Sequence, residues 1–238
     1  MTLNHYTLLS LIFLALSLMM KSIPLLEIET LKFFNSLMFN ETFFSYFTEI
    51  GNGLICLAIT IPLLSLISHK TTLNNVKAQT LVFVGIGVGV IVKGLKELTS
   101  IYAVRPGYYE FDDIVYLEPI YSFSSFPSGH AATMFSLFFV WISLSFRNIK
   151  IKYAGFLINM ILLFVLLVSL SRVVVAAHWL SDVLGSIAIA FLTLNAINMK
   201  VFRNILFESK VAKFSSFFLI VAAWAYIIFT GTIYEYEF

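Results

Sequence analysis

The stretch Phe126-Pro127-Ser128-Gly129-His130 stands directly before an uncharged, mostly apolar run at residues 131–146. Proline is tolerated in the first turn of a helix, because its missing N–H would have no helical partner there. The pattern therefore predicts a helix that begins beside Pro127 and continues through the apolar run. Its first turn would place a serine, a glycine and a histidine at an edge between apolar helix and water.

Six further apolar runs of comparable character lie at residues 6–20, 54–67, 78–92, 153–170, 183–199 and 214–233. The chain is 60% hydrophobic and 12% charged, with a mean hydropathy of +0.93, which is outside the range of ordinary soluble domains. Roughly 20 residues cross the hydrocarbon core of a bilayer. We therefore predict an all-α fold, a polytopic membrane helix bundle of seven helices in a single integral membrane domain over residues 1–238. The first run lacks a preceding basic region and a small-residue cleavage site, so it is expected to be a retained helix.

Basic residues are concentrated in alternate connections. The loops after the second, fourth and sixth predicted helices hold nine of the fifteen lysines and arginines: Lys70, Lys77, Arg147, Lys150, Lys152, Lys200, Arg203, Lys210 and Lys213. By the positive-inside rule these loops and the amino terminus are cytoplasmic, and the tail Glu235-Tyr236-Glu237 faces outward. The same assignment brings Arg105, His130, Arg172 and His178 to the outer face, although they come from two separate loops.

The start of the predicted helix at residue 129 is suited to an oxyanion. Unpaired backbone amides lie at the positive end of the helix dipole, and Gly129 would let an oxygen approach the backbone closely. The Ser128 hydroxyl adds a donor. Equally, Ser128 and Gly129 could be a capping turn and His130 an interfacial side chain.

A second group follows the fifth apolar run, where Ser171-Arg172 precedes His178 and Asp182. Residues four apart share a helix face, so the carboxylate could accept from one imidazole nitrogen and leave the other free to attack. The planar guanidinium of Arg172 matches phosphate oxygens. Ionisable residues at the edges of membrane helices are functional by default, although they can also be ordinary snorkelling side chains.

Lys93 and Lys96 stand at the outer end of the third predicted helix, and each could reach a phosphate or extend to lipid headgroups. Asp112 and Asp113 could bind a cation, but an acidic, solvated loop explains them more simply. The single Cys56 leaves zinc and iron–sulfur sites without a ligand set. We expect neither a metal nor a cofactor.

In order along the chain, Arg105-Pro106, Pro127-Ser128-Gly129-His130 and Ser171-Arg172 with His178 and Asp182 resemble the three-part signature of the type 2 phosphatidic acid phosphatase family. The motifs cover about residues 93–185, and the helix pattern extends the resemblance to about residue 200. The resemblance implies a metal-independent lipid phosphatase with a six-helix core over about residues 6–200. The seventh helix, about residues 214–233, would be additional to that core.

The resemblance also implies a role for each residue. His178 would be the nucleophile that forms a phosphohistidine, Asp182 its orienting partner, and His130 the acid that protonates the departing alcohol. The phosphate oxygens would be held by Arg105, Ser128, Gly129 and Arg172. The family's first motif places a lysine seven positions before the arginine, but here that position is Leu98, so the lysine's role is carried over to Lys96.

We therefore expect hydrolysis of a lipid phosphate monoester or diphosphate at the outer face of a bacterial inner membrane. Lipid A, undecaprenyl diphosphate, phosphatidylglycerophosphate and phosphatidate are the candidate substrate classes. The expected partners are the lipid and the bilayer, with no nucleic acid and no obligate protein partner. Two alternatives stay open: a phosphotransferase with a lipid hydroxyl as acceptor, and a non-catalytic carrier or anionic-lipid-binding protein. Haloperoxidases that bind vanadate share the motifs, but their soluble character argues against that function.

Overall fold

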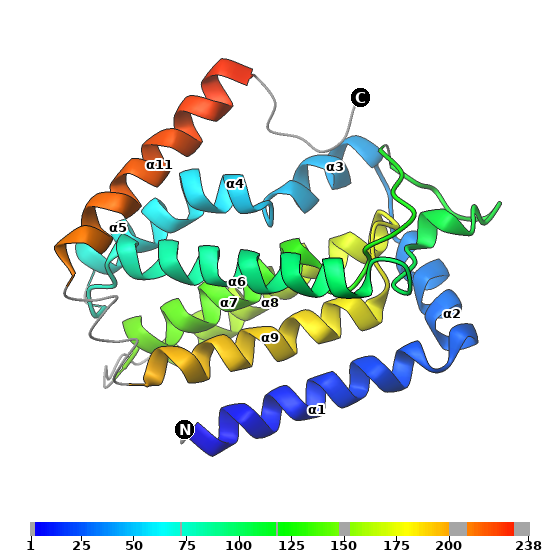
Figure 1. Ribbon diagram of the computed structural model, residues 1–238, viewed down its shortest axis with the longest axis horizontal. Helices are drawn as coiled ribbons and strands as arrows, with labels where there is room; N and C mark the ends of the chain where they lie inside the picture. Colours follow the sequence, from blue (N-terminus) through cyan, green and yellow to red (C-terminus); the bar gives the residue numbers. More distant parts are fainter. Residues whose placement is uncertain (1–2, 72, 118, 148–152, 200–208, 231–238) are drawn as a thin grey trace.

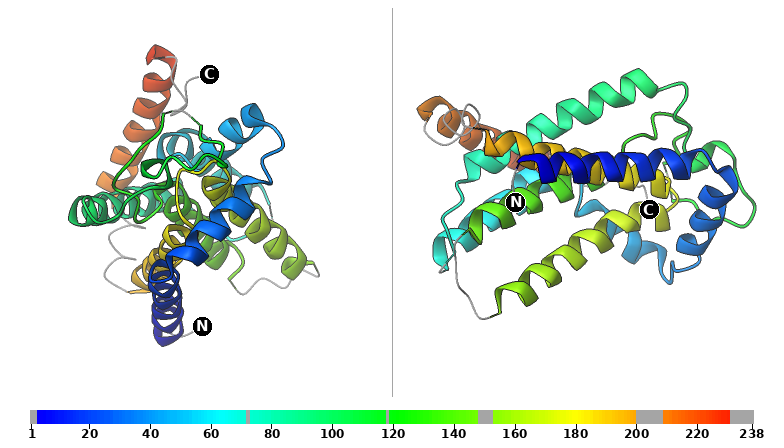
Figure 2. Two further views of the ribbon diagram at one scale, coloured as in Figure 1. Left: turned by 90° about the vertical axis from the view of Figure 1, so that its right-hand side faces the viewer. Right: turned by 90° about the horizontal axis from the view of Figure 1, so that it is seen from below.

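The computed structural model describes residues 3–71, 73–117, 119–147, 153–199 and 209–230. Within these ranges the chain is helical and contains no strand, which confirms the predicted all-α fold class. The long helices lie side by side as an elongated bundle, except for one helix near the carboxyl terminus that diverges from it (Figures 1 and 2).

All seven predicted apolar helices are present. Six of them are α1 (Leu3–Lys21), α6 (Ala78–Thr99), α7 (Gly129–Ser145), α8 (Ala154–Val174), α9 (Leu180–Asn198) and α11 (Lys210–Thr230). The predicted helix at 54–67 consists of α4 (Gly53–Ile55), the π-helical turn η1 (Cys56–Thr60) and α5 (Ile61–Lys70). Several predicted features lie outside the described residues, namely the end of the seventh helix at 231–233, the loop residues Lys150, Lys152, Lys200 and Arg203, and the tail at 235–237.

Five segments are long and apolar enough to cross a membrane: Gly53–Lys70, Ala78–Thr99, Ala154–Val174, Leu180–Asn198 and Lys210–Thr230. A sixth span is obtained if α1 is counted with α2 (Pro24–Asn35), to which it is bent by 97°. Helix α7 is shorter, with 17 residues, and most of its side chains are buried among its neighbours α6, α8 and α9. The protein is therefore an integral membrane protein with α7 at its centre.

The π-helical turn has a local cause. Pro62 has no N–H to donate to the carbonyl four residues earlier, so the regular helix ladder is interrupted there. The N–H of Ile61 bonds instead to the carbonyl of Cys56, five residues before it. The segment Gly53–Lys70 stays continuous through this wider turn.

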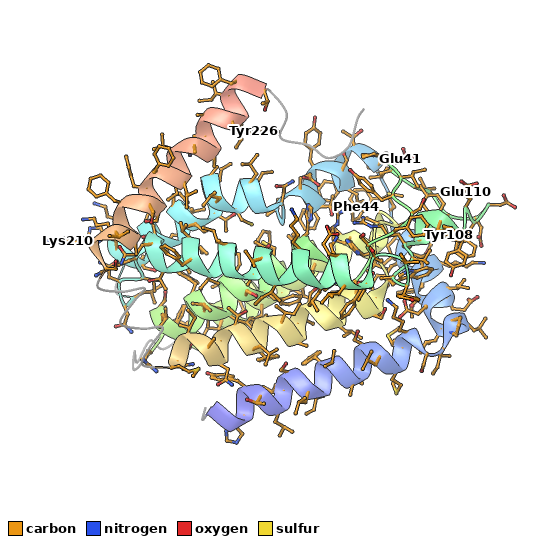
Figure 3. All side chains as sticks on the ribbon, viewed as in Figure 1. Glu41, Phe44, Tyr108, Glu110, Lys210 and Tyr226 are labelled. Atoms are coloured by element: carbon orange, nitrogen blue, oxygen red, sulfur yellow. The ribbon has the colours of Figure 1, made fainter. Side chains whose placement is uncertain are left out.

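Two helices were not predicted. Helices α2 and α3 (Glu41–Glu49) occupy the connection between the first two apolar helices. Asn40 caps α3, its side-chain oxygen accepting from the N–H of Phe43 at 2.7 Å. Figure 3 places Glu41 and Phe44 of α3 at the same end of the bundle as Tyr108 and Glu110 of the long loop after α6, whereas Lys210 lies at the other end.

Helix α1 packs along α9. Two buried serines fasten it: Ser10 donates to the carbonyl of Ala188 at 2.9 Å, and Ser17 donates to that of Ser181 at 2.7 Å. Small residues allow close approach of membrane helices, and their hydroxyls satisfy carbonyls across the interface. This packing brings the carboxyl end of α1 beside the first turn of α9.

Candidate active site

A cavity of about 320 Å³ lies at the end of the bundle where α6 ends and α7 begins. It is lined by Gly89, Val92, Lys93, Lys96, Glu97, Arg105, Ser124, Gly129, His130, Arg172 and His178. Six of the eight predicted site residues are in this lining: Lys96, Arg105, Gly129, His130, Arg172 and His178. The structure thus brings residues from four separate segments into one space.

His178 and Asp182 are in contact. The His178 Nδ1 lies 3.2 Å from Oδ2 of Asp182, and both side chains are buried. The same carboxylate accepts from the backbone N–H of Trp179 at 3.1 Å and from the Ser125 hydroxyl. Helix α9 begins at Leu180, so His178 precedes the helix and does not lie on its face as predicted. With a proton on Nδ1 facing the carboxylate, Nε2 is the nitrogen that can react.

A tight turn after α8 brings His178 back to Arg172. The carbonyl of Arg172 accepts from the N–H of Ala177 at 3.0 Å and from that of His178 at 3.1 Å. Ala176 adopts the left-handed conformation within this turn, with φ of 54°. A guanidinium and an imidazole six residues apart consequently line the same cavity.

The electrostatic environment keeps His178 uncharged. Burial, followed by the positive charges of Arg105, Lys96 and Arg172, holds the pKa of His178 well below its usual value of 6.5. The neutral imidazole is the form with a lone pair available for attack.

Glu49 was not predicted as a site residue. Its carboxylate, from the last residue of α3, lies 3.2 Å from His130 Nε2 and 3.6 Å from Nη1 of Arg172. Burial disfavours the charged form of Glu49, but the His130 hydrogen bond and the charges of His130 and Arg172 outweigh it, so the pKa of Glu49 is lowered. The Asn52 amide adds a donor at 2.7 Å, and Thr48 Oγ1 accepts from Arg172 at 3.2 Å. The sequence contained one indication of a role for Glu49, namely its position shortly before the apolar run at residues 54–67.

Arg105, Lys93 and Lys96 add positive charge to the cavity lining. Arg105 is fixed by hydrogen bonds from Nε to the carbonyl of Phe123 at 3.0 Å and from Nη1 to that of Ala177 at 3.4 Å. Lys93 and Lys96 both line the cavity from α6, whereas the side chain of Leu98 is 80% exposed. The cavity lining therefore contains lysines two and five residues before position 98.

Ser128 and Gly129 have different environments. Ser128 is fully buried and caps α7, its hydroxyl accepting from the N–H of Ala131 at 3.5 Å, and it is not part of the cavity lining. Gly129 is in the lining, and a methyl group on it would meet only Val92 at 3.7 Å. The backbone at the start of α7 therefore faces the cavity.

Lys21, at the end of α1, was also not predicted as a site residue. Its Nζ lies 3.9 Å from Oδ1 of Asp182, on the side away from His178. Asp113, by contrast, pairs with Lys32 at 2.7 Å on the surface. Among the described residues, no group of three or more histidine, cysteine, aspartate or glutamate side chains could hold a metal ion.

The chain is similar to known proteins in sequence pattern and in fold. The sequence pattern of the PAP2 superfamily matches residues 77–206, which is more than half of the chain. Two solved structures are similar in fold. LpxE of Aquifex aeolicus has 22% sequence identity and a TM-score of 0.55, and the match covers 72% of this chain and 93% of LpxE. The first transmembrane PAP2 type phosphatidylglycerolphosphate phosphatase from Bacillus subtilis has 21% identity and a TM-score of 0.59, and the match covers 86% of this chain and 98% of that protein. Curated protein sequences give no significant match.

Proposed function

The chain belongs to the PAP2 superfamily of phosphatases, and from this premise we propose that it dephosphorylates a membrane lipid through a phosphohistidine formed on His178. The observation that carries the proposal is the arrangement around one cavity: a neutral imidazole backed by Asp182, with Arg105, Arg172, Lys96 and a second histidine in the same lining.

The cations account for phosphate binding and for part of the rate. The transition state of phosphoryl transfer spreads negative charge over three equatorial oxygens. Arg105, Arg172 and Lys96 and the backbone at Gly129 surround the space in which those oxygens would lie. Because Arg105 is already held by two carbonyls, little reorganisation is needed when the charge develops.

The chemistry then requires two steps. In the first, Nε2 of His178 attacks phosphorus, a P–N bond forms, and the bond from phosphorus to the lipid oxygen breaks while protonated His130 gives its proton to that oxygen. In the second, neutral His130 takes a proton from water, the water oxygen attacks phosphorus, and the P–N bond breaks to release phosphate. Glu49 favours the charged form of His130 that the first step needs.

An apolar cavity supports a lipid as the substrate. It has a volume of about 800 Å³ and lies among α5, α7 and α8, with Ile50, Met134 and Phe138 in its lining. Met134 is one helical turn beyond His130, and a side chain on Gly51 would lie 3.0 Å from His130 and 3.3 Å from Met134. An acyl or prenyl chain could therefore start beside the catalytic cavity and continue along α7. Lipid A, undecaprenyl diphosphate, phosphatidylglycerophosphate and phosphatidate remain the candidate classes.

We place the amino terminus and the basic loops in the cytoplasm and the active site on the outer face of a bacterial inner membrane. The charge distribution of the loops supports this orientation. In the described part, Lys70, Lys77 and Lys210 belong to the end of the bundle opposite the catalytic cavity.

Phosphate release from purified lipids of these four classes tests the proposed function. The wild-type chain should release phosphate from at least one class, and His178→Asn should release none while giving the same thermal unfolding profile in detergent at a pH well above 6.5. A transfer of labelled phosphate to a second lipid, without free phosphate, would identify a phosphotransferase instead. Turnover by His178→Asn near that of the wild type would exclude the phosphohistidine.

A further inference from the structure

A second pocket lies at the other end of the bundle. It has a volume of about 570 Å³ and is formed by α5, the start of α6 and α11. Its lining consists of Pro62, Ser65, Leu66, His69, Asn75, Lys77, Ala78, Gln79, Lys213, Ser216, Phe217 and Ile220. On α6, Gln79 is the last residue that lines this pocket and Gly89 is the first that lines the catalytic cavity, so about 15 Å of the helix separates the two at 1.5 Å per residue.

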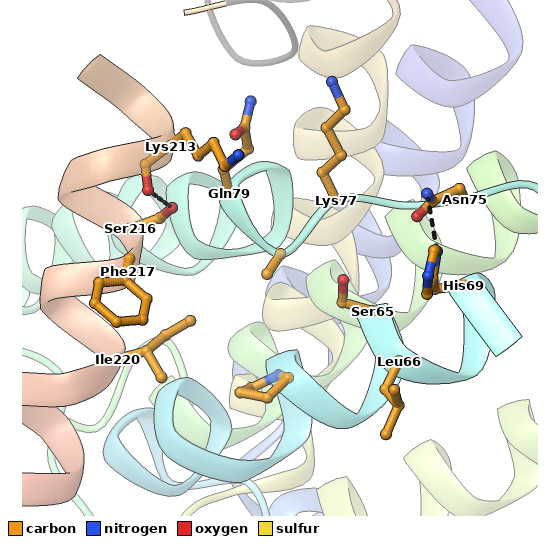
Figure 4. Close-up of a pocket in the computed structure, with 12 residues that line it drawn as sticks. Ser65, Leu66, His69, Asn75, Lys77, Gln79, Lys213, Ser216, Phe217 and Ile220 are labelled. Carbon is orange, nitrogen blue, oxygen red and sulfur yellow. Dashed lines mark hydrogen bonds between the residues drawn. The ribbon is translucent and has the colours of Figure 1, made fainter. Parts of the chain in front are cut away.

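The rim of this pocket is cationic and rich in hydrogen-bonding groups. Lys77 and Lys213 contribute positive charge from the start of α6 and from α11, and His69 and Gln79 lie on the same rim (Figure 4). No acidic residue is among the described residues that line it. The rim is therefore complementary to an anion.

The rest of the pocket is apolar. On α11, Phe217 and Ile220 follow Lys213 by four and seven residues, which places all three on one face of the helix. Leu66 and Pro62 of α5 continue this surface on the other side. Figure 4 shows Lys213, Gln79 and Lys77 along one edge of the pocket, with Phe217, Ile220 and Leu66 on the opposite side.

We propose that this pocket binds an anionic phospholipid from the leaflet opposite the catalytic cavity. The lysines would contact the phosphate group, and the first part of an acyl chain would lie on Phe217 and Ile220. Basic pockets between membrane helices suit anionic headgroups, and the polar rim with an apolar interior matches the two parts of a phospholipid. Helix α11 lies outside residues 77–206, so the site depends on a helix additional to the PAP2 match.

Native mass spectrometry of the full chain in detergent, titrated with phosphatidylglycerol and with phosphatidylcholine of the same acyl chains, tests the proposal. Phosphatidylglycerol should bind more tightly. A lysine near an anionic headgroup contributes a factor of about five, so Lys77→Gln with Lys213→Gln should weaken phosphatidylglycerol binding about 25-fold. The matched control is Lys70→Gln with Lys210→Gln, which removes the same charge from exposed lysines outside the lining, and it should change affinity less than about twofold.

Two further arms identify the ligand. Phe217→Asn should weaken lipid binding without changing the preference for phosphatidylglycerol, and soluble glycerol phosphate should not compete at equal concentration. Equal losses in the two double variants, no preference for the anionic lipid, or competition by glycerol phosphate would each overturn the proposal. Binding in the catalytic cavity is common to all these variants, so the comparison isolates the second pocket.

Discussion

Replacement of Glu49 by glutamine tests whether this residue keeps His130 ready to act as an acid. The substitution preserves the size of a fully buried side chain and removes its charge. Two full charges 3.2 Å apart interact by about 5 kcal/mol at an effective dielectric constant of 20, and desolvation of both groups cancels most of this. What remains of the attraction favours the charged form of His130 over the neutral one.

Glu49→Gln should therefore move the alkaline limb of the kcat profile to lower pH. Loss of one charge-assisted hydrogen bond, about 1.5–3 kcal/mol, should also lower kcat at pH 7 by roughly 10- to 150-fold. Steady-state phosphate release between pH 5 and 9 measures both effects. Glu49→Gln also removes the charge that pairs with Arg172 and could destabilise the fold, so the unfolding temperature of the variant is measured in the same buffers.

Two variants serve as controls. Glu41→Gln removes a carboxylate from the exposed start of the same helix, and its profile should equal that of the wild type. Glu49→Asp keeps the charge, so its alkaline limb should stay in place even where the shorter side chain lowers kcat. If Glu49→Gln lowered kcat but left the limb unmoved, the carboxylate would be structural, and its proposed action on the charge state of His130 would be refuted.

Three other outcomes are expected. Activity should survive a strong chelator and be inhibited by vanadate, a mimic of the transferring phosphoryl group; loss in chelator that magnesium restores would contradict the proposed mechanism. Lys96→Ala should raise KM and lower kcat more than Lys93→Ala does, because Lys96 is nearer in sequence to Arg105 and its charge lowers the pKa of His178. If steady-state kinetics were near wild type for both variants, neither lysine would contact the phosphate. Because the pKa of His178 in the folded chain is below 6.5, the unfolded chain is protonated at this residue first as the pH falls. The contribution of neutral His178 to stability is therefore complete above pH 6.5 and is lost as the pH falls towards the folded-state pKa. In thermal unfolding between pH 5 and 7, His178→Asn should not show this loss of stability.

The helices and half of the site were predictable because they depend on local pattern. An apolar run of about 20 residues has few alternatives to a membrane helix, since its backbone must be satisfied internally. The four-residue spacing of His178 and Asp182 indicated that they are in contact, although His178 precedes α9, which begins at Leu180. A turn at Ala176, which the spacing did not indicate, brings His178 back to Arg172.

Glu49 and Lys21 could not be predicted because their roles depend on distant segments. Each lies in the connection between the first two apolar helices, where charged residues are usually solvated. Glu49 meets a histidine 81 residues away, and Lys21 meets Asp182 because α1 packs along α9. The residues next to Glu49 and Lys21 in the sequence do not indicate which distant segments pack against them. The sequence also could not show what compensates for Leu98 at the position of the family's lysine. Only the structure of α6 shows that Lys93 and Lys96 line the cavity.

These two residues complete the charge balance of the site. Asp182 lies beside Lys21, and Glu49 lies beside Arg172, so each of these two carboxylates has a cation within 4 Å. With His130 protonated, the charges of Arg172 and His130 exceed that of Glu49 by one, and the charges of Lys93, Lys96 and Arg105 exceed that of Glu97 by two. A phosphate monoester carries close to two negative charges at neutral pH. The negative charges of Asp182 and Glu49 are thus balanced by the neighbouring Lys21 and Arg172. The negative charge of the substrate phosphate would be balanced by the positive charge of the other side chains that line the cavity.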